Sequence, residues 1–170
     1  MKTRYNLLAF IFIGTLGAIS HFVYEWSGNN KIIGYFFATN ESTWEHLKLL
    51  FFPTLIYSLA EYFFVKKEIK NYIPAVVISV IIGMLSIVVL FYTYKGVLGY
   101  NVDFINILIY YLGLLISLII KNKIIDSEIL SGKNFAIIFL SLAFLIAVAF
   151  FRFTYFPPEL NIFKPPVIDK

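Results

Sequence analysis

The chain is organised around the polar segment Thr39-Asn40-Glu41-Ser42-Thr43-Trp44-Glu45-His46-Leu47-Lys48. This segment is the densest group of polar and ionisable side chains in a very apolar protein. It opens an apolar run that continues to Val65, and a second polar group, Ser20-His21-Phe22-Val23-Tyr24-Glu25, ends the apolar run before it. We expect the two polar groups to face each other at one surface of a membrane.

The composition predicts a membrane protein. Of the 170 residues, 60% are hydrophobic and 19% are aromatic, and the mean hydropathy is +0.83. Soluble domains contain about 45–50% apolar residues, and repeated apolar runs of about 20 residues are typical of helices that cross a bilayer. The chain has no cysteine, which excludes disulfides, thiolate metal ligands and cysteine nucleophiles.

The apolar runs predict a single all-α domain, a polytopic transmembrane helix bundle with about five spans. The spans are expected at about residues 5–24, 42–65, 72–94, 102–120 and 135–153, and an extended proline-rich tail follows at 154–170. In the first loop, residues 26–39, the apolar stretch 32–38 is too short to span and is expected to lie in the membrane interface or to fold back over the helix ends. Pro53 is expected to kink the second span and to free a backbone carbonyl near Leu49. A cleaved signal peptide that ends near Ala18-Ile19-Ser20 is the less favoured interpretation of the first span.

The basic residues predict the orientation of the chain. The net charge is +4, but the cations are spread among short loops, which favours a topological role over nucleic-acid binding. With the N-terminus in the cytoplasm, the inner side holds Lys2, Arg4, Lys66, Lys67, Lys70, Lys121, Lys123 and Lys133, and the outer side holds Lys31, Lys48, Lys95, Arg152, Lys164 and Lys170. We therefore expect a multi-pass protein of the cell membrane that contacts membrane lipid and no nucleic acid, with its protein partners left open.

This topology gathers ionisable residues at the outer face. They are His21, Glu25, Glu41, Glu45, His46, Asp103 and Arg152. Imidazoles and carboxylates from two helices are suitable ligands for a divalent metal such as zinc, so His21, Glu25 and His46 are candidate metal ligands. Glu45 and Glu41 are candidate catalytic carboxylates, because a carboxylate beside a metal can act as a general base.

Each of these residues also has a structural explanation. Ser42-x-x-Glu45 matches a capping box at the start of a helix, and Asn40 is the alternative cap. His21 is equally well explained as an interfacial histidine bonded to a carbonyl, and Glu25 as a solvated loop acid; Glu41 has the same explanation. Arg152 is expected either to reach toward the membrane surface or to pair with Asp103.

Glu61 is a separate candidate near the inner end of the second span. His46, Tyr57 and Glu61 lie within about 80° of one another around a helix, so they would form one polar stripe. An acid within a span usually faces the bundle interior and has a partner, which favours a solute or proton path. The structural alternative is an interfacial position beside Lys66 and Lys67.

The polar motifs also carry a family resemblance. They are His21-Phe22-Val23-Tyr24-Glu25-Trp26-Ser27-Gly28, Asn40-Glu41-Ser42-Thr43-Trp44-Glu45-His46-Leu47-Lys48-Leu49 and Phe52-Pro53, with Pro157-Pro158 and Phe163 in the tail. Together they resemble an uncharacterised family of small five-helix bacterial membrane proteins, over nearly the whole chain. The resemblance implies a compact helix bundle and no particular activity.

Three functions are compatible with the sequence. The favoured hypothesis is a membrane-embedded, metal-dependent hydrolase with a polar site at the outer face that acts on a lipid-like or amphiphilic substrate. A small solute or ion transporter that uses His46, Tyr57 and Glu61 is the second. A non-catalytic membrane accessory protein, whose polar motif only builds the start of a helix, is the third, so whether the protein is an enzyme stays open.

Overall fold

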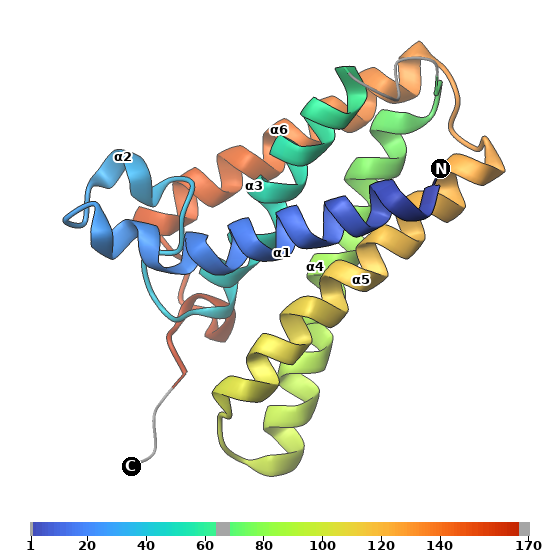
Figure 1. Cartoon of the computed structure of the whole chain (residues 1–170). Helices are drawn as coiled ribbons and strands as arrows, with labels where there is room; N and C mark the ends of the chain where they lie inside the picture. Colours follow the sequence, from blue (N-terminus) through green and yellow to red (C-terminus); the bar gives the residue numbers. More distant parts are fainter. Residues whose placement is uncertain (1, 64–68, 167–170) are drawn as a thin grey trace.

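The computed structural model describes residues 2–63 and 69–166 and is shown in Figure 1. Within these residues every regular element is helical, which confirms the all-α prediction. The elements are α1 (Lys2–Trp26), α2 (Lys31–Gly34), α3 (Thr43–Glu61), α4 (Tyr72–Leu98), α5 (Asp103–Ser127), α6 (Lys133–Tyr155) and the 3-10 helix η2 (Asn161–Phe163).

The five long helices start close to the predicted positions, and two of them are longer than predicted. α4 continues to Leu98, where Gly99 in the left-handed conformation ends it, and α5 continues to Ser127, where Glu128 does the same. The first loop contains the short helix α2, and the tail contains η2 in place of a wholly extended chain. The predicted end of the second span at residues 64–65 lies outside the described residues, as do Lys66 and Lys67.

Four helices, α1, α4, α5 and α6, are long and apolar enough to cross a membrane. The chain is therefore a multi-pass membrane protein. α3 is shorter, with 19 residues, and contains Glu45, Lys48 and Glu61. It tolerates these charges because it is surrounded by the other helices, and all three side chains are buried.

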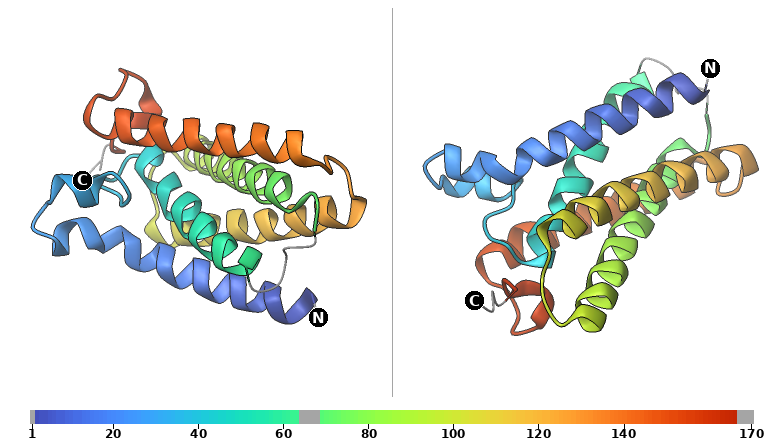
Figure 2. Two further views of the ribbon diagram at one scale, coloured as in Figure 1. Left: turned by 90° about the horizontal axis from the view of Figure 1, so that it is seen from above. Right: turned by 60° about the horizontal axis from the view of Figure 1, so that its bottom comes forward.

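α3 is the centre of the arrangement. Seen from above, α1 and α6 lie on opposite sides and α3 runs between them (Figure 2). α3 contacts α1, α4, α6 and η2, and its residues Leu50 and Phe51 are fully buried in the hydrophobic core. The same core includes Ile13 of α1, Leu114 of α5 and Phe150 of α6.

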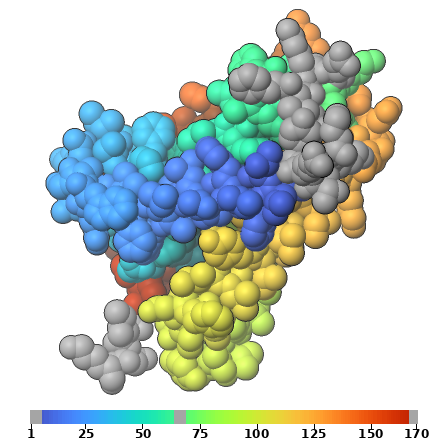
Figure 3. Space-filling model, in the orientation of Figure 1, coloured from blue at the N-terminus to red at the C-terminus, as the bar shows by residue number. Residues whose placement is uncertain are grey.

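α4 and α5 form an antiparallel pair whose turn projects away from α1, α2 and α6 (Figures 1 and 3). The two helices pack closely where Gly83 faces Gly113, because a Cβ atom at Gly83 would lie 2.9 Å from the Gly113 carbonyl oxygen. Small residues at such crossings allow helix backbones to approach each other in membranes. The turn of this pair lies at the same end of the bundle as the start of α3 and the tail.

The predicted free carbonyl of α3 has a partner on α5. Pro53 lies inside α3 and has no N–H to bond the Leu49 carbonyl. The Tyr110 hydroxyl instead lies 3.3 Å from the Leu49 oxygen and 2.9 Å from the Ile13 oxygen of α1. One tyrosine thus joins α1, α3 and α5, and Gly17 of α1 leaves the space that its hydroxyl occupies, because a Cβ atom there would overlap it.

Gly17→Ala is therefore expected to destabilise the protein by about 2 kcal/mol, because the methyl group displaces Tyr110 from both carbonyls. The free energy of unfolding in detergent, measured by circular dichroism during denaturant titration, tests this. Gly96→Ala is the matched control, since nothing lies within 4 Å of a Cβ atom at that helical glycine. Equal stability of the two variants would contradict the proposed role of Gly17.

Candidate metal centre

The start of α3 is fixed by short-range hydrogen bonds. The Ser42 hydroxyl accepts a hydrogen bond from the Glu45 N–H at 3.4 Å, so Ser42 is the N-cap. Asn40 is not the cap but supports it, because its side-chain oxygen accepts from the Ser42 N–H at 2.9 Å. The second half of the capping box is absent, since the Glu45 carboxylate accepts from the Thr39 N–H instead. This geometry leaves Glu41 exposed just before the helix.

The backbone orients the imidazole of His46. Its Nδ1 lies 2.9 Å from the Ser42 carbonyl oxygen, and a ring nitrogen at that distance from a carbonyl carries the proton. Its Nε2 lies 3.5 Å from Glu41 Oε2. Fixing one ring nitrogen with a carbonyl and leaving the other for a ligand is the usual arrangement of metal-binding histidines.

His21 approaches the same carboxylate from α1. Its Nε2 lies 3.5 Å from Glu41 Oε1, and its ring centroid lies 5.1 Å from that of His46. Its Nδ1 is buried and has no hydrogen-bond partner among the described residues, so the bond to a carbonyl expected for an interfacial histidine does not form. Phe22 packs edge-on against the His21 ring, with 4.9 Å between the ring centroids.

One atom from each of His21, Glu41 and His46 lies within 4.8 Å of the other two. Zinc binds nitrogen and oxygen ligands at about 2.0–2.2 Å, so small side-chain rotations would bring all three to a single ion. Glu41 is 63% exposed, and the cluster is therefore open to solvent. Two histidines, one glutamate and an open fourth position are the ligand set of catalytic zinc sites.

The cluster differs from the predicted set in the roles of three acids. Glu41, predicted as a catalytic carboxylate, lies between the two histidines. Glu25, predicted as a ligand, is exposed and lies outside the cluster, one helical turn beyond His21. Glu45 is 2% exposed and forms an ion pair with Lys48, so it does not face the cluster.

The Glu45–Lys48 pair is the centre of a buried network. The Lys48 ammonium is 0% exposed and lies 2.8 Å from Glu45 Oε2. It also donates to the Gly34 carbonyl at 2.9 Å and the Phe37 carbonyl at 3.3 Å, and to the Thr154 hydroxyl of α6. Glu45 accepts in addition from Thr39 and Thr154. The network attaches the first loop and α6 to the start of α3.

A second buried pair lies at the other end of α3. Lys121 of α5 donates to Glu61 Oε2 at 2.9 Å, and the Tyr72 hydroxyl of α4 donates to the same oxygen at 2.7 Å. The Lys121 ammonium also lies 5.7 Å from the centre of the Tyr57 ring. Glu61 therefore faces the bundle interior with a partner, as one of its two sequence interpretations predicts.

Asp103 and Arg152 do not join either cluster. Both are exposed, and the structure shows no ion pair between them. Asp103 begins α5, and the Arg152 guanidinium lies 4.1 Å from the centre of the Phe156 ring. The buried partners Lys121 and Thr154 were missed by sequence reasoning, although a lysine in an apolar span signals a paired charge.

Fold and clusters together define a class of protein: a multi-pass membrane helix bundle with a surface-exposed His–Glu–His cluster and a buried lysine–glutamate pair at each end of its central helix. The chain belongs to a family of unknown function, DUF6512, whose model matches residues 1–170. This confirms the uncharacterised family that the polar motifs resemble, whereas its bacterial origin stays a prediction. No curated protein and no solved structure matches the chain significantly.

Proposed function

We propose that the protein is a metal-dependent hydrolase of the membrane surface, with a divalent ion such as zinc held by His21, Glu41 and His46. The convergence of these three side chains within 4.8 Å carries the proposal. A bound zinc ion lowers the pKa of a water in its open position to about 7 and so supplies a nucleophile at neutral pH.

Charge balance at the cluster supports a cation. Glu41 has one histidine nitrogen at 3.5 Å from each of its oxygens. Because His46 Nδ1 carries the proton that is donated to the Ser42 carbonyl, Nε2 of the neutral ring has a lone pair and no hydrogen. A lone pair and a carboxylate repel each other at this distance, and a metal ion between them removes the repulsion.

Glu25 takes the role of general base in this proposal. It lies four residues after His21 in α1, on the same face of the helix, and its carboxylate has no hydrogen bond or ion pair among the described residues. A solvated carboxylate one turn from a metal-bound water can accept its proton. This exchanges the roles that the sequence suggested for Glu25 and Glu41.

The surroundings of the cluster favour an amphiphilic substrate. Phe22 and Trp26 follow His21 on α1, stack on each other and are exposed, and aromatic side chains are enriched at membrane–water interfaces. Loop cations favour a cytoplasmic N-terminus in the cell membrane, with the cluster outside. Lys48 and Lys121 are buried, so they are not loop cations. One was assigned to each side of the membrane, and the predicted excess of cations on the inner side therefore does not change.

Metal content of the detergent-purified chain, measured by elemental mass spectrometry after zinc repletion, tests the proposal. We expect about one zinc ion per chain, lost in His46→Ala and His21→Ala because two ligands do not hold the ion tightly. Glu25→Gln is expected to keep the metal and to lose at least about 100-fold in hydrolysis of a vesicle-borne ester. Glu159→Gln, in the exposed tail, is the control that changes neither quantity.

Absence of metal from the repleted wild-type protein, at intact helical content, would overturn the proposal. Glu41 would then pair with charged imidazoles, and the accessory role would take its place. Flux of a solute or proton into sealed vesicles that depends on Glu61 would instead support the transporter, which is favoured by one observation, the burial of the Glu61–Lys121 pair in the bundle interior.

A further inference from the structure

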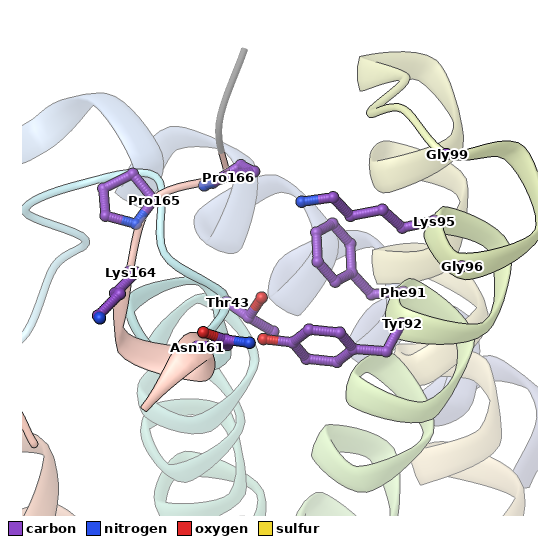
Figure 4. Close-up of a pocket in the computed structure, with 10 residues that line it drawn as sticks. All are labelled: Thr43, Phe91, Tyr92, Lys95, Gly96, Gly99, Asn161, Lys164, Pro165 and Pro166. Carbon is purple, nitrogen blue, oxygen red and sulfur yellow. The ribbon is translucent and has the colours of Figure 1, made fainter. Parts of the chain in front are cut away.

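A groove of about 450 Å³ lies between the last turns of α4 and the tail around η2, beside the start of α3 (Figure 4). Its lining includes Thr43, Phe91, Tyr92, Lys95, Asn161 and Pro166, none of which belongs to the candidate metal centre. We propose that this groove binds the anionic headgroup of a membrane lipid, with Lys95 as its cation.

The inner part of the groove carries unused hydrogen-bonding groups. The side chains of Thr43, Tyr92 and Asn161 point toward one another there (Figure 4). Thr43 is only 7% exposed, yet its hydroxyl has no hydrogen-bond partner among the described residues, and the same holds for the Tyr92 hydroxyl and the Asn161 amide. Tyr92 and Asn161 are exposed, so these groups open to the groove, where all three can donate hydrogen bonds to the oxygens of a phosphate.

Lys95 supplies the positive charge. Its side chain extends from α4 across the groove toward Pro166 (Figure 4), and its ammonium lies 5.9 Å from the centre of the Phe91 ring. The lining contains no acidic residue, and Lys95 forms no ion pair with any described residue. Lys164 also lines the groove, but its ammonium points away from α4 (Figure 4).

The surroundings of the groove point to a lipid as the source of this anion. The adjoining α4–α5 turn exposes large apolar side chains, with Val97 at 79% and Phe104 at 74% exposed. A turn in bulk water rarely exposes such a patch, so this turn lies in the membrane interface, where lipid phosphates gather.

Native mass spectrometry of the full chain in detergent, with phosphatidylglycerol or phosphatidylcholine added, tests the proposal. We expect phosphatidylglycerol to bind about tenfold more tightly, because the quaternary ammonium of phosphatidylcholine neutralises its phosphate and leaves no net negative charge for Lys95. Lys95→Gln is expected to abolish this preference and Lys95→Arg to keep it. Lys123→Gln, which removes an exposed lysine of α5, is expected to bind as the wild type does.

Equal binding of phosphatidylglycerol by the wild type and a folded Lys95→Gln variant would overturn the proposal. Displacement of the lipid by an equal concentration of inorganic phosphate would assign the groove to a soluble anion and overturn it too. If Lys95→Gln does not fold, Tyr92→Phe with Asn161→Ala replaces it, and unchanged lipid preference in that variant counts against the groove. No residue of the groove belongs to the candidate metal centre, so we expect metal content to stay the same in each variant, and failure here leaves the proposed function standing.

Discussion

Lys48→Met is expected to lower the free energy of unfolding by about 3–5 kcal/mol, because it leaves the Glu45 carboxylate buried without its cation. The four acceptors of the Lys48 ammonium come from three parts of the chain, the first loop, α3 and α6. Removing the ammonium therefore also loosens the first loop and the end of α6. Denaturant titration in mixed micelles measures the change, and Trp44, packed 4.8 Å from Phe150, reports on it by fluorescence.

Two further variants separate the ion pair from a general effect of losing a lysine. Lys31→Met removes an exposed lysine from α2 and is expected to change stability by less than about 0.5 kcal/mol. Lys48→Met combined with Glu45→Gln buries no charge and is expected to recover part of the loss. The Gly34 and Phe37 carbonyls still lack their donor, so recovery is incomplete. A single Lys48→Met variant within 1 kcal/mol of wild type would contradict this account.

The helices were predictable because each long apolar run is bounded by polar or turn residues. Hydropathy is a local property of the chain, so both ends of α1 and α6 and the start of α3 follow from the sequence to within a few residues. The predicted spans stop short of the observed ends of α4 and α5 because the prediction assigns Lys95 and Lys121 to loops. Whether a lysine in a helix ends a span depends on its partners in space, which the sequence does not specify.

The sequence predicts which two segments form the candidate site, but it does not predict correctly which acid takes which role. The two histidines converge because the polar ends of α1 and α3 share one end of the bundle. Glu41 and Glu45 are four residues apart, but Glu41 precedes the helix, so they do not share a face. That difference separates the exposed cluster from the buried pair, and it depends on where Ser42 caps α3.

At the opposite end of α3, Lys121→Met is expected to destabilise the protein by about 3 kcal/mol, because Glu61 keeps only the Tyr72 hydroxyl as a partner. Tyr72→Phe removes that one hydrogen bond and is expected to have a smaller effect, about 1 kcal/mol. Circular dichroism during denaturant titration measures both. Lys123→Met is the control, since it removes an exposed lysine two residues away in the same helix.

The two buried pairs test whether α3 acts as one body. Lys48 and Glu61 are 13 residues apart, or about 20 Å along a helix, and the pairs share no partner among the described residues. The effects of Lys48→Met and Lys121→Met are therefore expected to add within about 0.5 kcal/mol. A coupling above about 1 kcal/mol would contradict independent anchoring, because it would mean that releasing one end of α3 shifts the whole helix and weakens the pair at the other end.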